Sequence, residues 1–299
     1  MSNNFTRWSL FIILCIIWGS SFKLMKDSSV GLNAMQIAAL RIFSAGLVFI
    51  PFAIFHFGKI PREKRGVVVL SAVFGNLLPA FLFAEAMAHI DGSLGGILNS
   101  LTPICVVLIG IIFFRDKIKL KKIIGVLVGF AGLVLLTVTP VLMGEKTISF
   151  GSFQYILVVF LATLLYGINV NMVGHFLKAV NPVHIATVSL SFMTIPTAIV
   201  LWQQNILQVD LGNTFTREAV IASIALGIVA SAVATVLFYM LVQKAGGLFA
   251  SLVTSGIPFV ALAWGFFDRE KITVLQVVGL GIILLGVYMA NSRTSPKQT

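Results

Sequence analysis

Long apolar stretches alternate with short polar breaks along the whole chain. A helix needs about 20 mostly apolar residues to cross the hydrocarbon core of a bilayer, and stretches of that kind recur from one end of the chain to the other. We predict ten transmembrane helices, at residues 8–25, 34–57, 67–88, 93–114, 121–139, 152–175, 183–202, 218–242, 247–267 and 272–291. The longest polar interval, 203–217, leaves no room for a soluble domain. The pattern therefore predicts an all-α integral membrane protein.

The two halves of the chain resemble each other in four places that follow the same order. The first pair reads Trp-Gly-Ser-Ser-Phe and Tyr-Gly-Ile-Asn-Val, and the second reads Ile-Pro-Phe-Ala-Ile and Ile-Pro-Thr-Ala-Ile. The matched pairs are 18–22 with 166–170, 50–54 with 195–199, Pro103 with Pro258, and the Asp/Glu-Lys…Gly…Gly blocks 116–132 with 270–286. Ordered matches of this kind indicate an internal repeat.

Each repeat holds five predicted helices, divided at residues 1–144 and 145–299. Because five is odd, the second copy must enter the membrane from the opposite side, so the two copies are inverted. Inverted repeats are typical of secondary transporters, in which two half-units rock about a substrate site at their interface near the middle of the bilayer. The repeat therefore favours transport by alternating access.

These features are similar to those of EamA-type transporters, which belong to the drug/metabolite transporter superfamily. The resemblance rests on the tandem five-helix halves, the Trp-Gly-Ser-Ser-Phe motif, Arg41 in the second helix and the paired Pro…Asp/Glu-Lys…Gly…Gly blocks, and it covers about residues 8–291. It implies ten helices, cytoplasmic termini and export of amino acids or related metabolites. The family usually has Glu after the fourth helix, where this chain has Asp116. The family covers many substrates, so the resemblance does not name one.

Composition and charge fit the same interpretation. The chain is 58% apolar and only 10% charged, against roughly 25% charged residues in soluble domains. A net charge of +11 could suggest nucleic acid, but the basic residues lie in short loops between apolar stretches. Most of them fall on one side if the N-terminus is inside, as the positive-inside rule requires of cytoplasmic loops. We therefore expect a multi-pass protein of the cytoplasmic (inner) membrane with both termini in the cytoplasm, and no nucleic-acid partner.

Charged residues inside predicted helices are the first candidates for a site. A charge near the centre of a membrane helix costs at least about 2.5–3.5 kcal/mol, so Arg41, Glu85 and Lys23 each need a reason. Lys23 lies near a helix end and reaches the headgroups easily. Glu85 either pairs with Arg41 or Lys23, or it binds an amine or a coupling proton. The matching positions in the other repeat, Met240 and Ala186, carry no charge, which favours substrate or ion binding by Arg41 and Glu85.

Neutral polar and aromatic side chains at mid-membrane depth extend the candidate substrate site. They are Trp18, Ser21, Asn76, Asn99, Thr102, Tyr166, Asn169, Tyr239, Thr254 and Ser255. A Ser or Thr in a membrane helix is often satisfied by its own backbone, whereas an Asn amide is harder to satisfy in that way. The asparagines are therefore the stronger candidates. Trp18 and Tyr166, at matching places, either form aromatic walls or simply pack.

Prolines and glycines suggest moving and static parts. A proline inside a membrane helix frees a carbonyl and bends the helix, and we predict gating roles for Pro103 and Pro258, simple curvature of the bundle being the alternative. Glycines near residues 125–132 and 279–286 have small-xxx-small spacing, which allows close helix contact. We expect these two helices to form a scaffold, or else a homodimer face.

Other functional classes have less support in the sequence. The four histidines are scattered at helix ends, and no HExxH, GxSxG or phosphate-binding Gly-rich motif occurs. We therefore expect no enzyme activity, no metal and no cofactor, and no ATP-driven pump. The favoured function is a secondary transporter, an exporter, of small polar metabolites such as amino acids, with a proton as the candidate coupling ion. A facilitative exchanger, a channel-like permease and, with least support, a membrane-embedded enzyme remain as alternatives.

Overall fold

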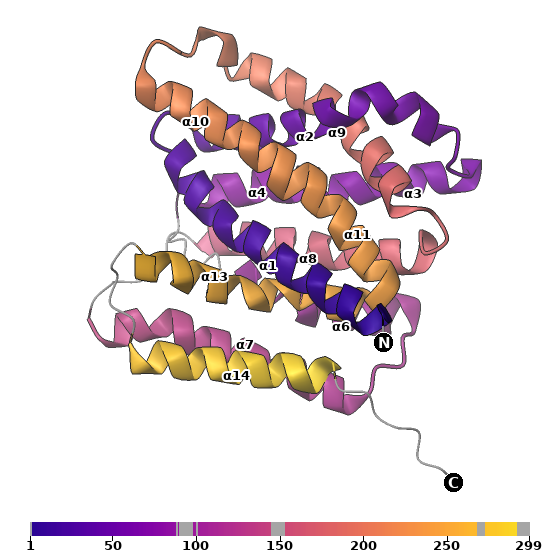
Figure 1. The fold of residues 1–299 in the computed structure, drawn as a ribbon, viewed down its shortest axis with the longest axis vertical. Helices are drawn as coiled ribbons and strands as arrows, with labels where there is room; N and C mark the ends of the chain where they lie inside the picture. The colour runs from indigo at the N-terminus through magenta and orange to yellow at the C-terminus, as the bar shows by residue number, and fades with distance from the viewer. Residues whose placement is uncertain are drawn as a thin grey trace.

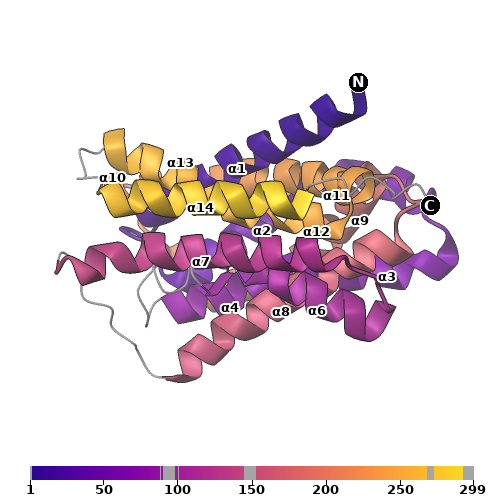
Figure 2. The same cartoon turned by 90° about the horizontal axis from the view of Figure 1, so that it is seen from below.

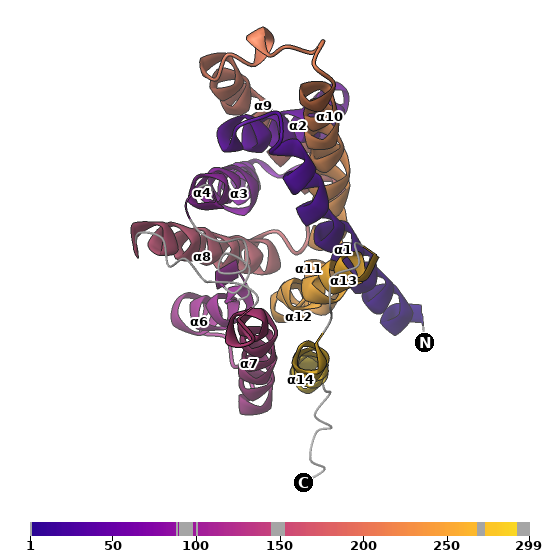
Figure 3. The same ribbon diagram turned by 90° about the vertical axis from the view of Figure 1, so that its left-hand side faces the viewer.

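The computed structural model describes residues 2–87, 89, 98–99, 101–144, 153–267 and 273–291. Within these ranges the secondary structure is helical throughout. The helices run alongside one another in a single bundle, which Figure 1 shows from the side and Figure 3 shows along the helices. Helix α1 begins and α14 ends at the same end of the bundle, which we call the terminal end (Figure 1).

The helices follow the predicted apolar stretches closely. Up to residue 144 they are α1 (Ser2–Ser28), α2 (Ala34–Phe57), α3 (Arg62–Ala72), η1 (Val73–Leu77), α4 (Leu78–Met87), α6 (Thr102–Phe114) and α7 (Leu120–Leu142). After it they are α8 (Phe153–Phe176), α9 (Pro182–Gln203), η2 (Ile206–Gln208), α10 (Thr214–Ala225), η3 (Leu226–Val233), α11 (Ala234–Ala245), α12 (Gly247–Ser251), α13 (Val253–Phe267) and α14 (Val274–Asn291). The first part of the predicted helix 93–114 lies mostly outside the described residues.

Five helical segments of the described chain are long and apolar enough to cross a bilayer. They are Ala34–Phe57, Arg62–Ala86, Phe153–Phe176, Pro182–Gln203 and Thr214–Ala245. Three shorter apolar helices, Thr102–Phe114, Gly247–Val260 and Val274–Ala290, accompany them. The all-helical membrane architecture is confirmed at this level, because these segments match predicted stretches in type and position.

Two of the long segments contain a π-helical turn in their middle. Segment η1 separates α3 from α4, and η3 separates α10 from α11. In both, a backbone N–H donates to the carbonyl oxygen five residues earlier in the chain. Leu78 N donates to Val73 O in this way, and Ala234 N donates to Val229 O. A π turn widens the helix and redirects its side chains, and such turns concentrate at functional sites.

Helices α7 and α14 lie side by side at one edge of the bundle (Figures 1 and 2). Their glycines interlock: a Cβ on Gly286 would meet the backbone of Gly129 and Gly125, and a Cβ on Gly132 would meet the Gly279 carbonyl oxygen at 2.8 Å. The hydrophobic effect does not drive helices together within lipid, so close van der Waals packing of the two backbones stabilises this helix pair instead. The predicted glycine faces are therefore used within the chain, as a scaffold at its edge.

Candidate functional site

Arg41 brings a cationic side chain into the middle of the bundle. It lies half-buried on α2, where its Nε donates a hydrogen bond to Ser231 Oγ on η3 over 2.7 Å. The guanidinium also lies within electrostatic range of the Tyr166 side chain on α8. Helix α2 approaches η3 very closely, because Gly227 has no side chain to keep Ser44 and the Arg41 carbonyl away. The π turn and Gly227 together place Ser231 opposite Arg41.

Trp18 holds α1 against the same π turn. Its indole Nε1 donates to the backbone carbonyl of Ala230 over 3.0 Å, next to Ser231, and its ring packs against Phe238 at 5.3 Å between centroids. Trp18 and Arg41 thus bind successive residues of η3 from two different helices. The Ser21 hydroxyl turns back to the Trp18 carbonyl at 2.6 Å, so it is satisfied within its own helix.

A second polar group lies one helical turn further along. The buried Tyr239 hydroxyl on α11 lies beside Ser71, Asn76 and Asn169, although none of these contacts has full hydrogen-bond geometry. Thr235 Oγ1 donates to Asn76 Oδ1 at 3.3 Å. We call Ser71, Asn76, Asn169, Thr235 and Tyr239 the central polar cluster. It joins α8 and α11 to the π-helical segment η1.

Asn169, like Tyr239, has a buried polar atom without a hydrogen bond in the described part of the chain. It is buried, and its Oδ1 accepts no hydrogen bond from the described part of the chain. Its amide packs directly against Gly75 of η1, at the place where any Cβ would lie. A buried polar atom without a hydrogen bond costs about 1–3 kcal/mol, so native structures usually keep one only where it serves a purpose. The Tyr239 hydroxyl, which is itself without a hydrogen bond, lies beside this amide.

Three of these side chains share one helix face. Ser231, Thr235 and Tyr239 are spaced four residues apart, and they contact Arg41, Asn76 and Asn169 respectively. The sequence pointed to Tyr166, Asn169 and Tyr239 but not to Ser71, Ser231 and Thr235. The four-residue spacing back from Tyr239 is the signal that would have found the last two.

Other predicted site residues lie elsewhere. Thr254 donates to the Ser251 carbonyl at 2.8 Å, and Ser255 lines an apolar groove of about 380 Å³ between α1, α13 and α14. Glu85 is half-buried on α4 and forms no ion pair with Arg41 or any other described cation. The Lys23 side chain lies outside the described residues, so the alternative pairing of Glu85 with Lys23 stays a prediction.

Pro103 and Pro258 occupy different places in their helices. Pro103 is in the first turn of α6, and the carbonyl that it leaves free, that of Asn99, accepts the Thr102 hydroxyl at 2.5 Å. Pro258 lies inside α13. The Asn99 amide oxygen is buried and accepts no hydrogen bond from described residues. The gating roles of the two prolines stay predictions.

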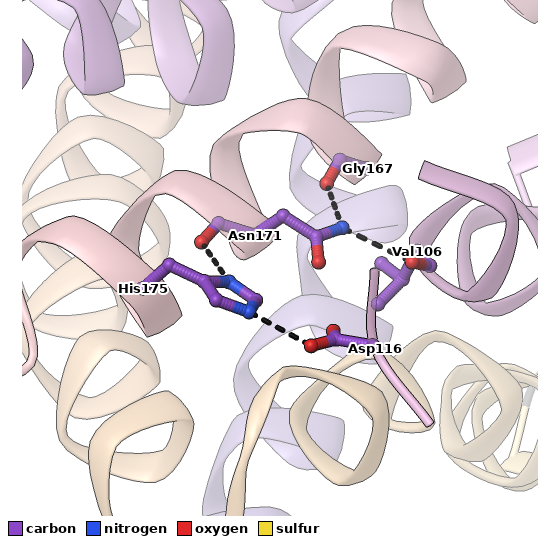
Figure 4. Close-up of polar contacts among 5 residues, drawn as sticks. All are labelled: Val106, Asp116, Gly167, Asn171 and His175. Atoms are coloured by element: carbon purple, nitrogen blue, oxygen red, sulfur yellow. Dashed lines mark hydrogen bonds and ion pairs between the residues drawn. The ribbon is translucent and has the colours of Figure 1, made fainter. Parts of the chain in front are cut away.

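A separate group of polar residues lies at the terminal end, shown in Figure 4. His175 on α8 places its Nε2 at 3.0 Å from Asp116 Oδ1 and its Nδ1 at 2.9 Å from the Asn171 carbonyl. The Asn171 amide donates to the carbonyls of Val106 and Gly167, at 3.0 and 2.9 Å. At the same end, the Nδ1 atoms of His56 on α2 and His184 on α9 lie 2.7 Å apart. The sequence showed these histidines only as scattered.

Comparison with known proteins identifies the fold and its family. The model of the EamA-like transporter family matches the chain twice, at residues 7–138 and 153–292. The chain belongs to the EamA-like transporter family. It is therefore a membrane transporter, and the resemblance drawn from its sequence motifs is confirmed.

Individual EamA-like relatives are distant but cover nearly the whole chain. An uncharacterized transporter of Archaeoglobus fulgidus is 25% identical over 95% of this chain and 98% of its own length. The chloroplastic WAT1-related protein At3g02690 of Arabidopsis thaliana is also 25% identical, over 96% of this chain and 70% of its own length. A solved crystal structure superimposes with a TM-score of 0.72 at 17% identity, over 94% of both chains. At that identity the structural match speaks for the fold alone.

Proposed function

We propose that this EamA-like protein exports small polar metabolites, such as amino acids or related compounds, across the cytoplasmic membrane by gradient-driven alternating access. The observation that carries the proposal is the buried polar path at mid-bundle, where Arg41, Tyr166 and Ser231 adjoin the central polar cluster. Polar and ionisable residues at such depth are expensive, and they mark substrate or ion pathways in membrane proteins.

An inverted repeat of two five-helix halves, residues 1–144 and 145–299, supports alternating access. The family model matches once in each half. The π turns η1 and η3 begin 153 residues apart (226 minus 73). Both the fourth and the ninth predicted helix break at a leucine, Leu101 and Leu252. One residue after Leu101 and two residues after Leu252, a threonine donates to a carbonyl three residues back. We propose ten spans and a hinge at these matched π turns and breaks, with Pro103 and Pro258 beside them.

The chemistry of the path favours a zwitterionic or acidic substrate. The Arg41 guanidinium offers several N–H donors in a fixed plane, which suits a carboxylate. Asn169 and Asn76 offer amides, and the aromatic rings of Trp18 and Tyr166 form walls at matched places in the two halves. Glu85 would bind a substrate amine or carry a coupling proton.

The basic loops gather at the terminal end, which we propose is cytoplasmic by the positive-inside rule. Residues 58–66, 115–122, 178 and 244 all lie there, and helix α1 begins and helix α14 ends there (Figure 1). Substrate would therefore enter at the terminal end and leave at the opposite end.

Metabolite release tests the proposal. Cells expressing the wild-type chain, Arg41→Gln or Glu85→Gln at equal membrane abundance are compared with an empty-vector control by profiling the medium. We expect wild type to release one compound class and Arg41→Gln to release little more than the control. Release equal to the control by the wild-type chain under all conditions tested would contradict the exporter function.

Counterflow separates the transporter alternatives. Vesicles loaded with the identified compound should take up labelled compound faster than empty vesicles, because alternating access exchanges substrate across the membrane. Equal rates of uptake by loaded and empty vesicles would instead favour a channel-like permease. Chemical conversion of the compound during either assay would favour the membrane-enzyme alternative.

A further inference from the structure

A cavity of about 370 Å³ opens at the terminal end, away from the central polar cluster. Helices α8, α11 and α12 and the segment after α6 surround it. Its polar lining consists of Asp116, Asn171, His175, Lys178, Gln243 and Lys244. Asp116 belongs to the first repeat and His175 to the second, so their contact bridges the two halves at this mouth.

The hydrogen bonds of His175 require a bound proton. Its Nδ1 faces the Asn171 carbonyl oxygen at 2.9 Å, and a carbonyl oxygen can only accept, so Nδ1 carries a hydrogen. Its Nε2 faces Asp116 Oδ1 at 3.0 Å. A second hydrogen must lie between these two atoms, either on the imidazole or on the carboxyl. The two contacts drawn in Figure 4 are both hydrogen bonds only when the pair holds one proton more than a neutral histidine beside a carboxylate.

The surrounding structure fixes both groups in place. Asn171 uses both amide hydrogens on backbone carbonyls, so the turn that supports His175 is rigid. The Phe114 ring stacks on the imidazole with centroids 4.2 Å apart. Arg115 ends α6 in the left-handed conformation with φ 54°, and the Asp116 N–H then donates to the Gly110 carbonyl at 2.9 Å. The Asp116 carboxylate lies over Gly110, where a Cβ would approach it within 2.8 Å.

Water can reach this proton from one side. The side chains of His175 and Asp116 remain 33% and 35% exposed. Lys178 and Lys244 line the same cavity, and Arg115 and Lys117 flank Asp116 in the chain.

The equivalent positions in the other repeat carry different residue types. With the offsets of the flanking motif matches, 148 (166 minus 18) and 154 (270 minus 116), His175 corresponds to Asp27 and Asp116 to Glu270. Two acids replace a histidine and an acid. The pairing of a histidine with an acid therefore occurs at these matched positions in one repeat only.

We propose that Asp116 and His175 form a proton-binding latch at the terminal mouth, and that its proton is the coupling ion of the transporter. When the proton leaves to water, His175 keeps its Nδ1–H on Asn171, and the Nε2 lone pair then faces the carboxylate. Two acceptors repel each other, so the Asp116–His175 contact breaks and the Asp116 segment of the mouth loosens, while the Asn171–Val106 hydrogen bond keeps α8 joined to α6. The link to coupling rests on the proposed transport function, whereas the latch itself does not.

Thiol accessibility tests the latch without a substrate. Gly174 lines the cavity, and a Cβ there meets Val242 Cγ1 only at 3.7 Å, so Gly174→Cys fits. The native Cys15 and Cys105 are buried, and a chain without Gly174→Cys measures their background. The protein in nanodiscs is labelled with a charged maleimide at about pH 6 and about pH 8, the range over which histidine changes charge.

We expect the rate of labelling at Gly174→Cys to rise from the lower to the higher pH more than the reagent alone explains. His175→Gln and Asp116→Asn in the same background measure the reagent's own pH dependence. The rise with the native pair should exceed that in either variant by roughly threefold, the factor expected from one net hydrogen bond. His89→Gln, at the opposite end of the bundle, should keep the full rise.

Equal pH ratios in the native pair and in both variants would overturn the latch. Coupling is read separately, as the dependence of metabolite release on an imposed pH gradient. If the rate of metabolite release does not depend on the pH gradient, while the pH dependence of labelling still differs between the native pair and the variants, only the coupling role would be overturned. If the wild-type chain releases nothing while the labelling difference persists, the export function fails and the latch stands.

Discussion

The Nε of Arg41 donates to Ser231 Oγ over 2.7 Å, which ties α2 to the π turn of η3. Ser231→Ala removes this acceptor and leaves the guanidinium oriented less firmly. Hydrogen bonds to charged groups are worth about 1.5–3 kcal/mol, so we expect export to fall by about tenfold or more at low substrate concentration. Ser189→Ala is the matched control, because the Ser189 hydroxyl bonds only to its own helix, at the Ala186 carbonyl. Equal export by both variants would contradict a role for Ser231.

Gly75 allows η1 to pack directly against the amide of Asn169. Gly75→Ala puts a methyl group where that amide lies, so Asn169 must move or the two helices must separate. Overpacking of this kind costs about 1–3 kcal/mol. We expect a lower melting temperature in detergent and loss of export. Gly66→Ala is the control, since a Cβ on Gly66 meets no atom within 4 Å and should leave both measurements unchanged.

The glycines between α7 and α14 provide a stability test that is independent of the site. A Cβ on Gly286 would overlap the backbone of Gly129, so Gly286→Ala should lower stability by about 1–3 kcal/mol. On the same helix a Cβ on Gly281 meets open space, and alanine favours a helix by roughly 0.5–1 kcal/mol over glycine. Gly281→Ala should therefore leave the melting temperature equal or raise it. A similar loss in both variants would contradict the packing.

The contact between His56 and His184 should make the stability of the fold sensitive to acid. Their Nδ1 atoms lie 2.7 Å apart, so one ring must donate and the other must accept. Protonating both rings removes the acceptor and places two cations together, so the folded pair binds fewer protons than the unfolded chain. Stability should therefore fall as pH is lowered through the range where histidine gains charge, about pH 8 to 5. Melting temperatures of wild type and His184→Gln across that range check this, and parallel curves would contradict it.

The two histidine pairs respond to pH with opposite signs. The His175–Asp116 pair needs its proton and weakens as pH rises, whereas the His56–His184 pair needs a lone pair and weakens as pH falls. A stability profile for wild type, His184→Gln and His175→Gln should separate the two effects, because each variant removes one of them. If His175→Gln changes only the acid side of the profile, the assignment of the proton at the latch is wrong.

The positions of the helices could be read from hydrophobicity. The predicted helix 34–57 is α2 residue for residue, and the predicted helix 183–202 is α9 within one residue at each end. In a bilayer the backbone must satisfy its own hydrogen bonds, so a long apolar stretch has little choice but a helix. Hydrophobicity did not predict η1 or η3, because an extra residue in one turn leaves the apolar pattern almost unchanged.

The sequence predicted which residue types belong to the site but not which of them are in contact. The cost of burying charge and amides pointed to Arg41, Asn169 and Asn76 from the sequence. Whether Arg41 meets Glu85 or Ser231 depends on how α2 crosses η3, and that crossing is set by the missing side chain of Gly227. His175 and Asp116 are 59 residues apart in the chain and looked unrelated until the fold joined them.

The sequence by itself therefore determined the membrane class, the helix positions and the family, because each of these follows from local apolar length or from motifs along the chain. Only the tertiary structure decided which polar atoms meet: the Arg41–Ser231 bond, the central polar cluster and the contact between Asp116 and His175. The physical reason is that hydrogen bonds act over about 3 Å. A contact of that range depends on helix crossings and π turns that hydrophobicity, summed over whole helices, does not specify.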